Sequence, residues 1–295
     1  MSISALQVKE LRERTGAGMM ECKKALTEAG GDMDTAVEWL RKQGLAKADK
    51  KAGRVAAEGL IAMQISPDGK RGVMVDLNCE TDFVAKGDPF RDFAAGLTNR
   101  VLSGRPAGLD EFLAMPYEQG GSKTVNEVRQ EKVAAIGENI SIRRIADLSA
   151  KNGVVGGYLH GTRIGVLVEL EGGNAELAKD IAMHVAASRP LCVSPDQVSP
   201  ELIAKEKEIF MAQAAESGKP KEIIEKMVMG RVNKFLKEST LLGQPFVKNP
   251  DITVEQLCKD GKAKVIRFER FEVGEGIEKK SANFAEEVMA QVRGN

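Results

Sequence analysis

The same order of elements is indicated twice along the chain: a β-hairpin, a helical stretch and a closing strand. In the first half these segments are 59–65 and 73–77 for the hairpin, 88–102 and 122–136 for the helices, and 139–146 for the closing strand. Apolar runs separated by a turn such as Ser66-Pro-Asp-Gly69 are typical of antiparallel hairpins. A chain with this pattern is expected to build small antiparallel sheets covered by helices.

The second half repeats the order. Its segments are 154–159 and 164–170 for the hairpin, 174–187 and 200–238 for the helices, and 263–273 for the closing strand. A tight turn is predicted around His160-Gly161. We therefore predict an α+β fold with two related subdomains, each a three-stranded antiparallel sheet.

Residues 200–238 indicate two helices rather than one. Ser217-Gly-Lys-Pro220 divides them, because Gly ends helices and Pro begins them. Each half carries an apolar stripe at helical spacing: Ile209, Phe210, Ile224, Val228, Val232 and Phe235. We predict a projecting antiparallel helical hairpin, a short coiled coil, whose stripes pack either on each other or on a second molecule, such as another copy of the chain.

The first 45 residues predict three short helices. Thr15-Gly-Ala-Gly18 separates the first two, Gly30-Gly31 ends the second, and Asp32 is a candidate cap of the third. The basic segment 46–54 that follows is interpreted as a solvated linker or a short helix.

Composition excludes several classes of protein. The formal net charge is +0 and aromatic residues make up 4%, so no general attraction to nucleic acid or anionic membrane is indicated. No apolar run is long enough to span a bilayer, and the N-terminus lacks a secretory signal. The four cysteines are widely spaced, which favours reduced, buried thiols and a cytoplasmic location.

Motifs that bind nucleotides or metals are also missing. The sequence contains neither GxxxxGK[ST] nor GxGxxG, and its two histidines have no metal-ligand spacing. We therefore expect no cofactor, no bound metal, no direct binding of nucleotide or nucleic acid, and no catalytic residues.

Two other hypotheses stay open at this point. A ribosome- or RNA-binding module would use the basic residues between Lys47 and Arg54, although the charge balance argues against it. An enzyme would use Cys79 and His160, but the sequence gives no paired geometry, and a buried structural thiol is the alternative reading of Cys79.

Two longer motifs resemble the elongation factor Ts family. They are Leu11-Arg-Glu-Arg-Thr-Gly-Ala-Gly-Met-Met-Glu-Cys-Lys-Lys-Ala-Leu26 and Asp76-Leu-Asn-Cys-Glu-Thr-Asp-Phe-Val-Ala-Lys86. The likeness continues through segments 136–140, 160–166, 183–188, 243–247 and 271–278, whereas 103–125 matches no motif.

The resemblance implies a domain organisation. It predicts a ubiquitin-associated-like helical module at 1–54, core subdomains at 55–149 and 150–274 with the hairpin 200–238, and a C-terminal module at 275–295.

The resemblance also implies a function: a guanine-nucleotide exchange factor for the GTPase elongation factor Tu. Residues Thr81, Asp82, Phe83 and Val84 would displace the magnesium of the GTPase. The further contact residues implied are Arg12, Met19, Met20, Ile136 and His160.

The residues themselves leave these roles open. Asp82 is a natural helix cap, and Phe83 either fills the core or projects as a wedge. Met19 and Met20 have two readings: one of them packs in the helical module, or it contacts a partner. Because they are adjacent on a helix they cannot face the same way, so the other is free for a partner.

Overall fold

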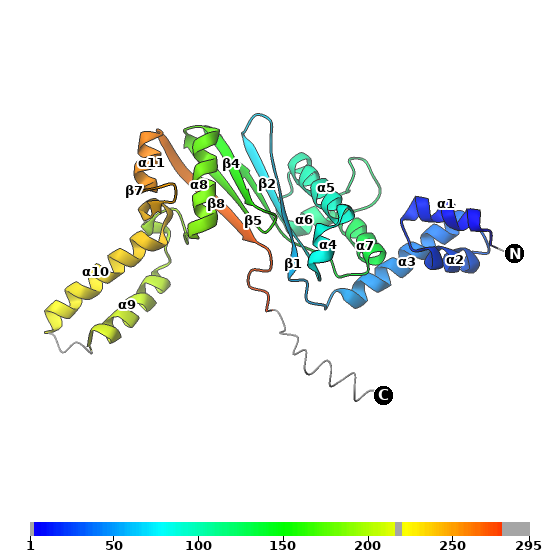
Figure 1. Cartoon of the computed structure of the whole chain (residues 1–295), viewed down its shortest axis with the longest axis horizontal. Helices are drawn as coiled ribbons and strands as arrows, with labels where there is room; N and C mark the ends of the chain where they lie inside the picture. The colour runs from blue at the N-terminus through cyan, green and yellow to red at the C-terminus, as the bar shows by residue number, and fades with distance from the viewer. Residues whose placement is uncertain (1–2, 216–219, 279–295) are drawn as a thin grey trace.

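The computed structural model describes residues 3–215 and 220–278 of the chain (Figure 1). Its first three helices, α1, α2 and α3, are Ala5–Thr15, Met19–Glu28 and Met33–Lys51. They pack around a small core that includes Leu11, Cys22 and Leu26. The Oδ1 of Asp32 accepts the backbone N–H of Thr35 at 2.8 Å, as expected of a cap of the third helix.

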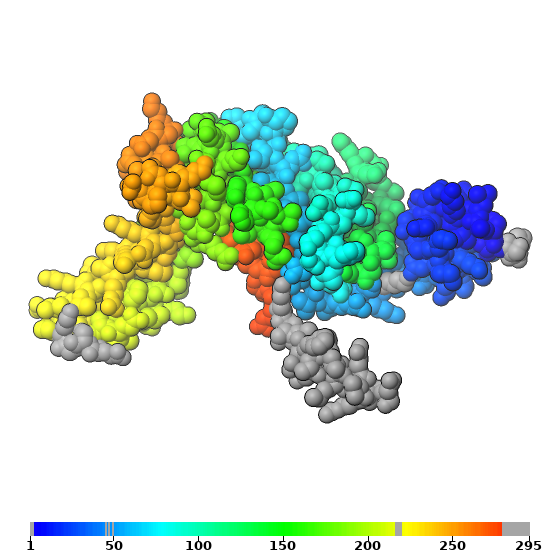
Figure 2. All heavy atoms as spheres, in the orientation of Figure 1, coloured from blue at the N-terminus to red at the C-terminus, as the bar shows by residue number. Residues whose placement is uncertain are grey.

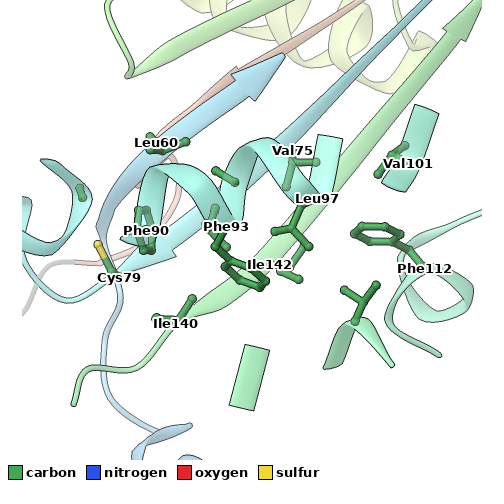
Figure 3. Packing of buried hydrophobic residues seen from close by; sticks show 14 of the residues in the cluster. Leu60, Val75, Cys79, Phe90, Phe93, Leu97, Val101, Phe112, Ile140 and Ile142 are labelled. Carbon is green, nitrogen blue, oxygen red and sulfur yellow. The ribbon is translucent and has the colours of Figure 1, made fainter. Parts of the chain in front are cut away.

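The first sheet has the order β1-β2-β3 and is antiparallel. Its strands are Glu58–Ile65, Arg71–Cys79 and Ser141–Ser149. Four helices, α4 to α7, lie between the second and third strands: Asp82–Lys86, Asp88–Gly104, Leu109–Ala114 and Val125–Ile136. They bury one face of the sheet around Phe90, Phe93 and Phe112 (Figure 3).

The second sheet has the order β4-β5-β8. Its strands are Gly153–His160, Ile164–Gly172 and Ala263–Glu272. Helix α8, Ala175–Ser188, covers its outer face together with α11, Val254–Asp260. The remaining elements are the 3-10 turns η1, Pro195–Gln197, and η2, Leu241–Gly243, the helices α9, Pro200–Ala215, and α10, Lys221–Ser239, and the short strands β6, Pro245–Phe246, and β7, Asn249–Thr253.

The two sheets pack face to face. A shared core fills the space between them, with Ile61, Met74 and Leu148 from the first sheet and Leu167 and Phe271 from the second. Strand β2 is consequently buried at every position, with helices on one side and the second sheet on the other. The α+β architecture and both three-stranded sheets confirm the sequence-based prediction.

A buried ionic cluster interrupts the core between the sheets. Asp76 of β2 is fully buried, and its Oδ2 accepts from Arg144 Nε at 2.8 Å and lies 3.7 Å from Arg143 Nη1. A bulge in β3 opposite Asp76 and Leu77 brings both arginines to this side. Burial raises the pKa of Asp76, although the neighbouring arginines oppose that shift.

Helices α9 and α10 form the predicted antiparallel hairpin, which projects from the second subdomain (Figures 1 and 2). Residues 216–219, between the two helices, lie outside the described residues. Several apolar side chains of the hairpin are exposed: Ile209, Met211, Ile223 and Met229. Of the predicted stripe residues only Ile209 is exposed, whereas Phe210, Ile224, Val228, Val232 and Phe235 are buried or half-buried in the hairpin.

Helix α3 continues to Lys51, so most of the segment 46–54 is helical, as the second of the two predicted readings had it. Helix α6 and the pair β6–β7 with α11 were not predicted, because they are short and follow turns. The proposed C-terminal module at 275–295 falls mostly outside the described residues. Within the described ranges, no helix is both long and apolar enough to cross a bilayer.

His184 of α8 fixes the base of the hairpin. Its Nδ1 accepts the Val247 N–H at 3.2 Å, so the neutral ring carries its proton on Nε2 and donates it to Gln244 Oε1 at 2.9 Å. The Gln244 side-chain amide in turn donates to Glu238 O, in the last turn of α10, at 2.7 Å. Burial lowers the pKa of His184.

We predict that this histidine makes the fold sensitive to acid. A base whose pKa is lowered by folding binds more protons in the unfolded state, so stability is complete above the unfolded value of 6.5 and falls as the pH drops below it. The contribution of one proton has a limiting slope of about 1.4 kcal/mol per pH unit. Urea unfolding between pH 7.5 and 5.5 measures it.

The exposed histidine supplies the control for this measurement. In His160→Gln the free energy of unfolding should fall between pH 7.5 and 5.5 as it does in the wild type. In His184→Gln the part of this fall that His184 causes should be absent. Equal dependence in both variants would contradict the assignment.

Candidate functional site

The corner between β2 and α4 is built by Thr81. Its backbone is extended, and its Oγ1 accepts the N–H of Val84 at 3.3 Å, so Thr81 is the N-cap of the helix. The prediction that Asp82 caps this helix is therefore wrong by one residue. Asp82 is instead the first helical residue, where its negative charge favours the helix N-terminus.

Phe83 projects from this corner into solvent. Its exposed fraction is 85%, whereas Val84 packs against the core of the first sheet and Ala85 is buried. The inward-facing residues anchor the short helix and leave the aromatic ring outside. The core-filling interpretation of Phe83 is therefore wrong.

Asp82 stands beside the exposed ring as a charged group. Its Oδ2 accepts from Lys86 Nζ at 2.6 Å, one helical turn away. This hydrogen bond lowers the pKa of Asp82, so the carboxylate is ionised at neutral pH. The corner thus presents an aromatic ring next to a negative charge.

Glu138 holds the corner from the loop before β3. Its Oε2 accepts the backbone N–H groups of Glu80 and Thr81, both at 3.0 Å, and its Oε1 accepts the Thr81 hydroxyl at 2.6 Å. Within the motif 136–140, the sequence pointed to Ile136 and not to Glu138. The contact joins residues 57 positions apart, so no local pattern could reveal it.

Ile136 ends helix α7 just before this loop. Its side chain is half-buried and packs against the core of the first sheet, and Gly137 ends the helix with a φ of 89°. Ile136 therefore offers only part of its side chain to a partner.

His160 lies at the same end of the sheets as the corner. Glu58, the first residue of β1, lies opposite Cys79 at the end of β2. Its carboxylate forms an ion pair at 2.7 Å with Arg163, in the turn that follows His160. The turn after β4 is also tied to β1 by the bond from Ile61 N to Thr162 O at 2.8 Å. His160 is exposed, and its Nδ1 lies 3.2 Å from the Tyr158 hydroxyl.

Arg12, Met19 and Met20 lie on the N-terminal helices, which form a lobe at one end of the molecule (Figure 2). The two methionines are 59% and 76% exposed, so the reading in which one packs inside the module is wrong. They begin α2, and the module core is filled by later residues of that helix. Met20 also lines a groove of about 650 Å³ between this module and α7.

The proposed enzyme pair is not assembled. Cys79 is fully buried (Figure 3), and its Sγ donates to Thr81 O at 3.1 Å. Burial raises the pKa of this thiol to about 12. His160 has Tyr158 beside it instead. In the part of the chain that the structure describes, no three His, Cys, Asp or Glu side chains gather as a metal site requires.

The basic segment proposed for RNA binding has partners within the fold. Lys51 Nζ donates to Gly137 O, and Arg54 lies 3.6 Å from Glu80. RNA binding through this segment stays a prediction, and none of these contacts favours it.

Comparison with known proteins decides the family. Residues 80–275 match the family model described as elongation factor TS. The chain belongs to the elongation factor Ts family. Its corner, its Glu138 loop and His160 all lie within the matched range. As a member of the elongation factor Ts family, the chain is a translation elongation factor.

Full-length relatives support the same assignment. The chain is 63% identical over 293 residues to an elongation factor Ts of Methylococcus capsulatus, covering 99% of both chains. It is 60% identical over 295 residues to that of Thioalkalivibrio sulfidiphilus, covering 100% of both. For Legionella pneumophila the identity is 56% over 292 residues. The likeness to elongation factor Ts therefore includes the N-terminal module.

We predict that Cys79 is chemically inert in the folded protein. With a pKa of about 12, about one thiol in ten thousand is ionised at pH 8, and the thiolate is the reactive form. Iodoacetamide should alkylate the half-buried Cys192 first and leave Cys79 unmodified, as measured by peptide mass spectrometry. In guanidinium all four cysteines should react. Rapid native labelling of Cys79 would revive the covalent-chemistry hypothesis.

Proposed function

We propose that this chain is a guanine-nucleotide exchange factor that binds the GDP form of elongation factor Tu, displaces its magnesium and promotes GDP release. The observation that carries the proposal is the exposed Phe83, 85% accessible on a corner that Val84 and Ala85 anchor in the core. An exposed ring adds no burial free energy to the fold, whereas interface anchors are often aromatic.

The mechanism is displacement rather than acid–base chemistry. Magnesium neutralises the phosphates of a bound nucleotide, so a wedge that shifts the elements holding the metal leaves phosphate charge uncompensated. Phe83 is the proposed wedge, Asp82 supplies a negative charge beside it, and Thr81 and Val84 hold both in place. Bound exchange factor then lowers the affinity of the GTPase for GDP, and bound GDP lowers its affinity for the exchange factor by the same factor.

The remaining contact residues extend this surface. His160 is exposed at the same end of the sheets as the corner, and Ile136 precedes the loop that holds the corner. Arg12, Met19 and Met20 are exposed on the N-terminal module. We propose that the module docks on the nucleotide domain of the GTPase while the corner acts at its metal.

Further features are proposed with the same function. The hairpin α9–α10 is a candidate surface for a homodimer, because Ile209, Met211, Ile223 and Met229 stay exposed after the two helices have packed together.

We also propose that the chain is organised as modules at 1–54, 55–149, 150–274 and 275–295. It acts in the cytoplasm without a cofactor and without binding nucleotide or nucleic acid directly.

Removal of the wedge should separate exchange from folding. We predict that Phe83→Ala slows stimulated GDP release at least about tenfold, as expected for a central anchor. Its free energy of unfolding should change by less than about 0.5 kcal/mol, because the ring is outside the core. Stopped-flow release of labelled GDP from elongation factor Tu measures the rate.

A matched control is Leu191→Ala, which also removes an exposed apolar side chain. It should exchange at the wild-type rate. Undiminished GDP release with the Phe83 variant would overturn the wedge mechanism.

A further inference from the structure

The loop 137–139 contacts the corner between β2 and α4 through the Glu138 carboxylate and the Asn139 backbone. We propose that Glu138 is the positioning residue of the exchange corner: its carboxylate presets the backbone from which Phe83 projects. This inference rests on the proposed function and names a residue on which the wedge depends.

Three donors converge on this single carboxylate. Two are consecutive backbone N–H groups, of Glu80 and Thr81, and the third is the Thr81 hydroxyl. Bonds to an ionised acceptor are stronger than neutral ones, and two adjacent amides fix the orientation of the peptide planes between them. The end of β2 is thereby held in one conformation before any partner binds.

The Thr81 hydroxyl passes this restraint to the helix. It donates its proton to Glu138 at 2.6 Å while accepting the Val84 N–H at 3.3 Å. The first turn of α4, which carries Phe83, is therefore linked to the carboxylate through one oxygen atom. Without Glu138 the hydroxyl is free to rotate, and the start of the helix loses its fixed point.

A reciprocal contact closes the arrangement. Glu80 Oε1 accepts the Asn139 N–H at 2.6 Å, so each segment offers a carboxylate to the backbone of the other. The Asn139 side chain, only 6% exposed, donates to Arg54 O at 2.8 Å, and Lys51 donates to Gly137 O. The same loop therefore fixes the end of α3.

This connection has a functional consequence. Helix α3 leads to the N-terminal module, and α4 carries the wedge, so one loop sets the two proposed contact regions relative to each other. A partner then meets a preformed pair of surfaces and spends less binding free energy on ordering them.

The test begins in the absence of any partner. In the full-length chain, Glu138→Ala should increase hydrogen exchange at the amides of Glu80 and Thr81 by at least about tenfold, because both lose a charge-assisted bond. Glu138→Gln retains one oxygen acceptor without the charge and should give a smaller increase. Glu118→Ala, at an exposed glutamate, is the control and should change neither amide.

The second arm asks whether Glu138 acts through Phe83. Glu138→Ala should slow stimulated GDP release about tenfold in the wild-type background and by less than about twofold in the Phe83→Ala background, since coupled residues are not additive. Glu138→Gln should retain most of the rate.

Each other outcome is decisive. Unchanged amide exchange in Glu138→Ala would overturn the positioning role and leave the proposed function standing. An equal loss of rate in both backgrounds would also overturn it, because Glu138 would then act independently of the wedge. If the wild-type chain fails to accelerate GDP release, the proposed function fails, and amide exchange alone still decides whether Glu138 positions the corner.

Discussion

The packing of the two three-stranded sheets against each other is the interaction on which the rest of the structure depends. It buries both faces of β2, so that strand has no freedom to tilt or slide. Val73 and Val75 face the helices, while Met74 faces the second sheet. The residues that follow β2 therefore leave the core at a fixed point and in a fixed direction.

The corner places an exposed apolar side chain on rigid backbone. Leaving a Phe in water forgoes about 2 to 3 kcal/mol of burial free energy, so folding gains nothing from Phe83. The backbone beneath it is held by other groups: Val84 in the core and the carboxylate of Glu138. Stability and partner binding thus use different atoms of the same short segment, and each can be altered with little effect on the other.

The sequence predicted those elements whose signals are local. Both hairpins, the N-terminal helices and α9–α10 were recognised from turns and apolar periodicity, and the α+β class followed. The cap of α4 was misplaced by one residue because Thr81 and Asp82 both suit an N-cap, and only the backbone decides between them. Glu138 was missed because its partners are distant in the chain. Neither Met19 nor Met20 packs in the module core, because Cys22 and Leu26 fill it.

The double-sided burial of β2 also limits how the length of the chain can vary. Successive residues of a strand face opposite sides, so inserting or deleting one residue exchanges the two faces. Asp76 would then point into the apolar core under the helices, away from Arg144, and Val75 would enter the ionic cluster. For this strand, residue count is as strict a requirement as residue type.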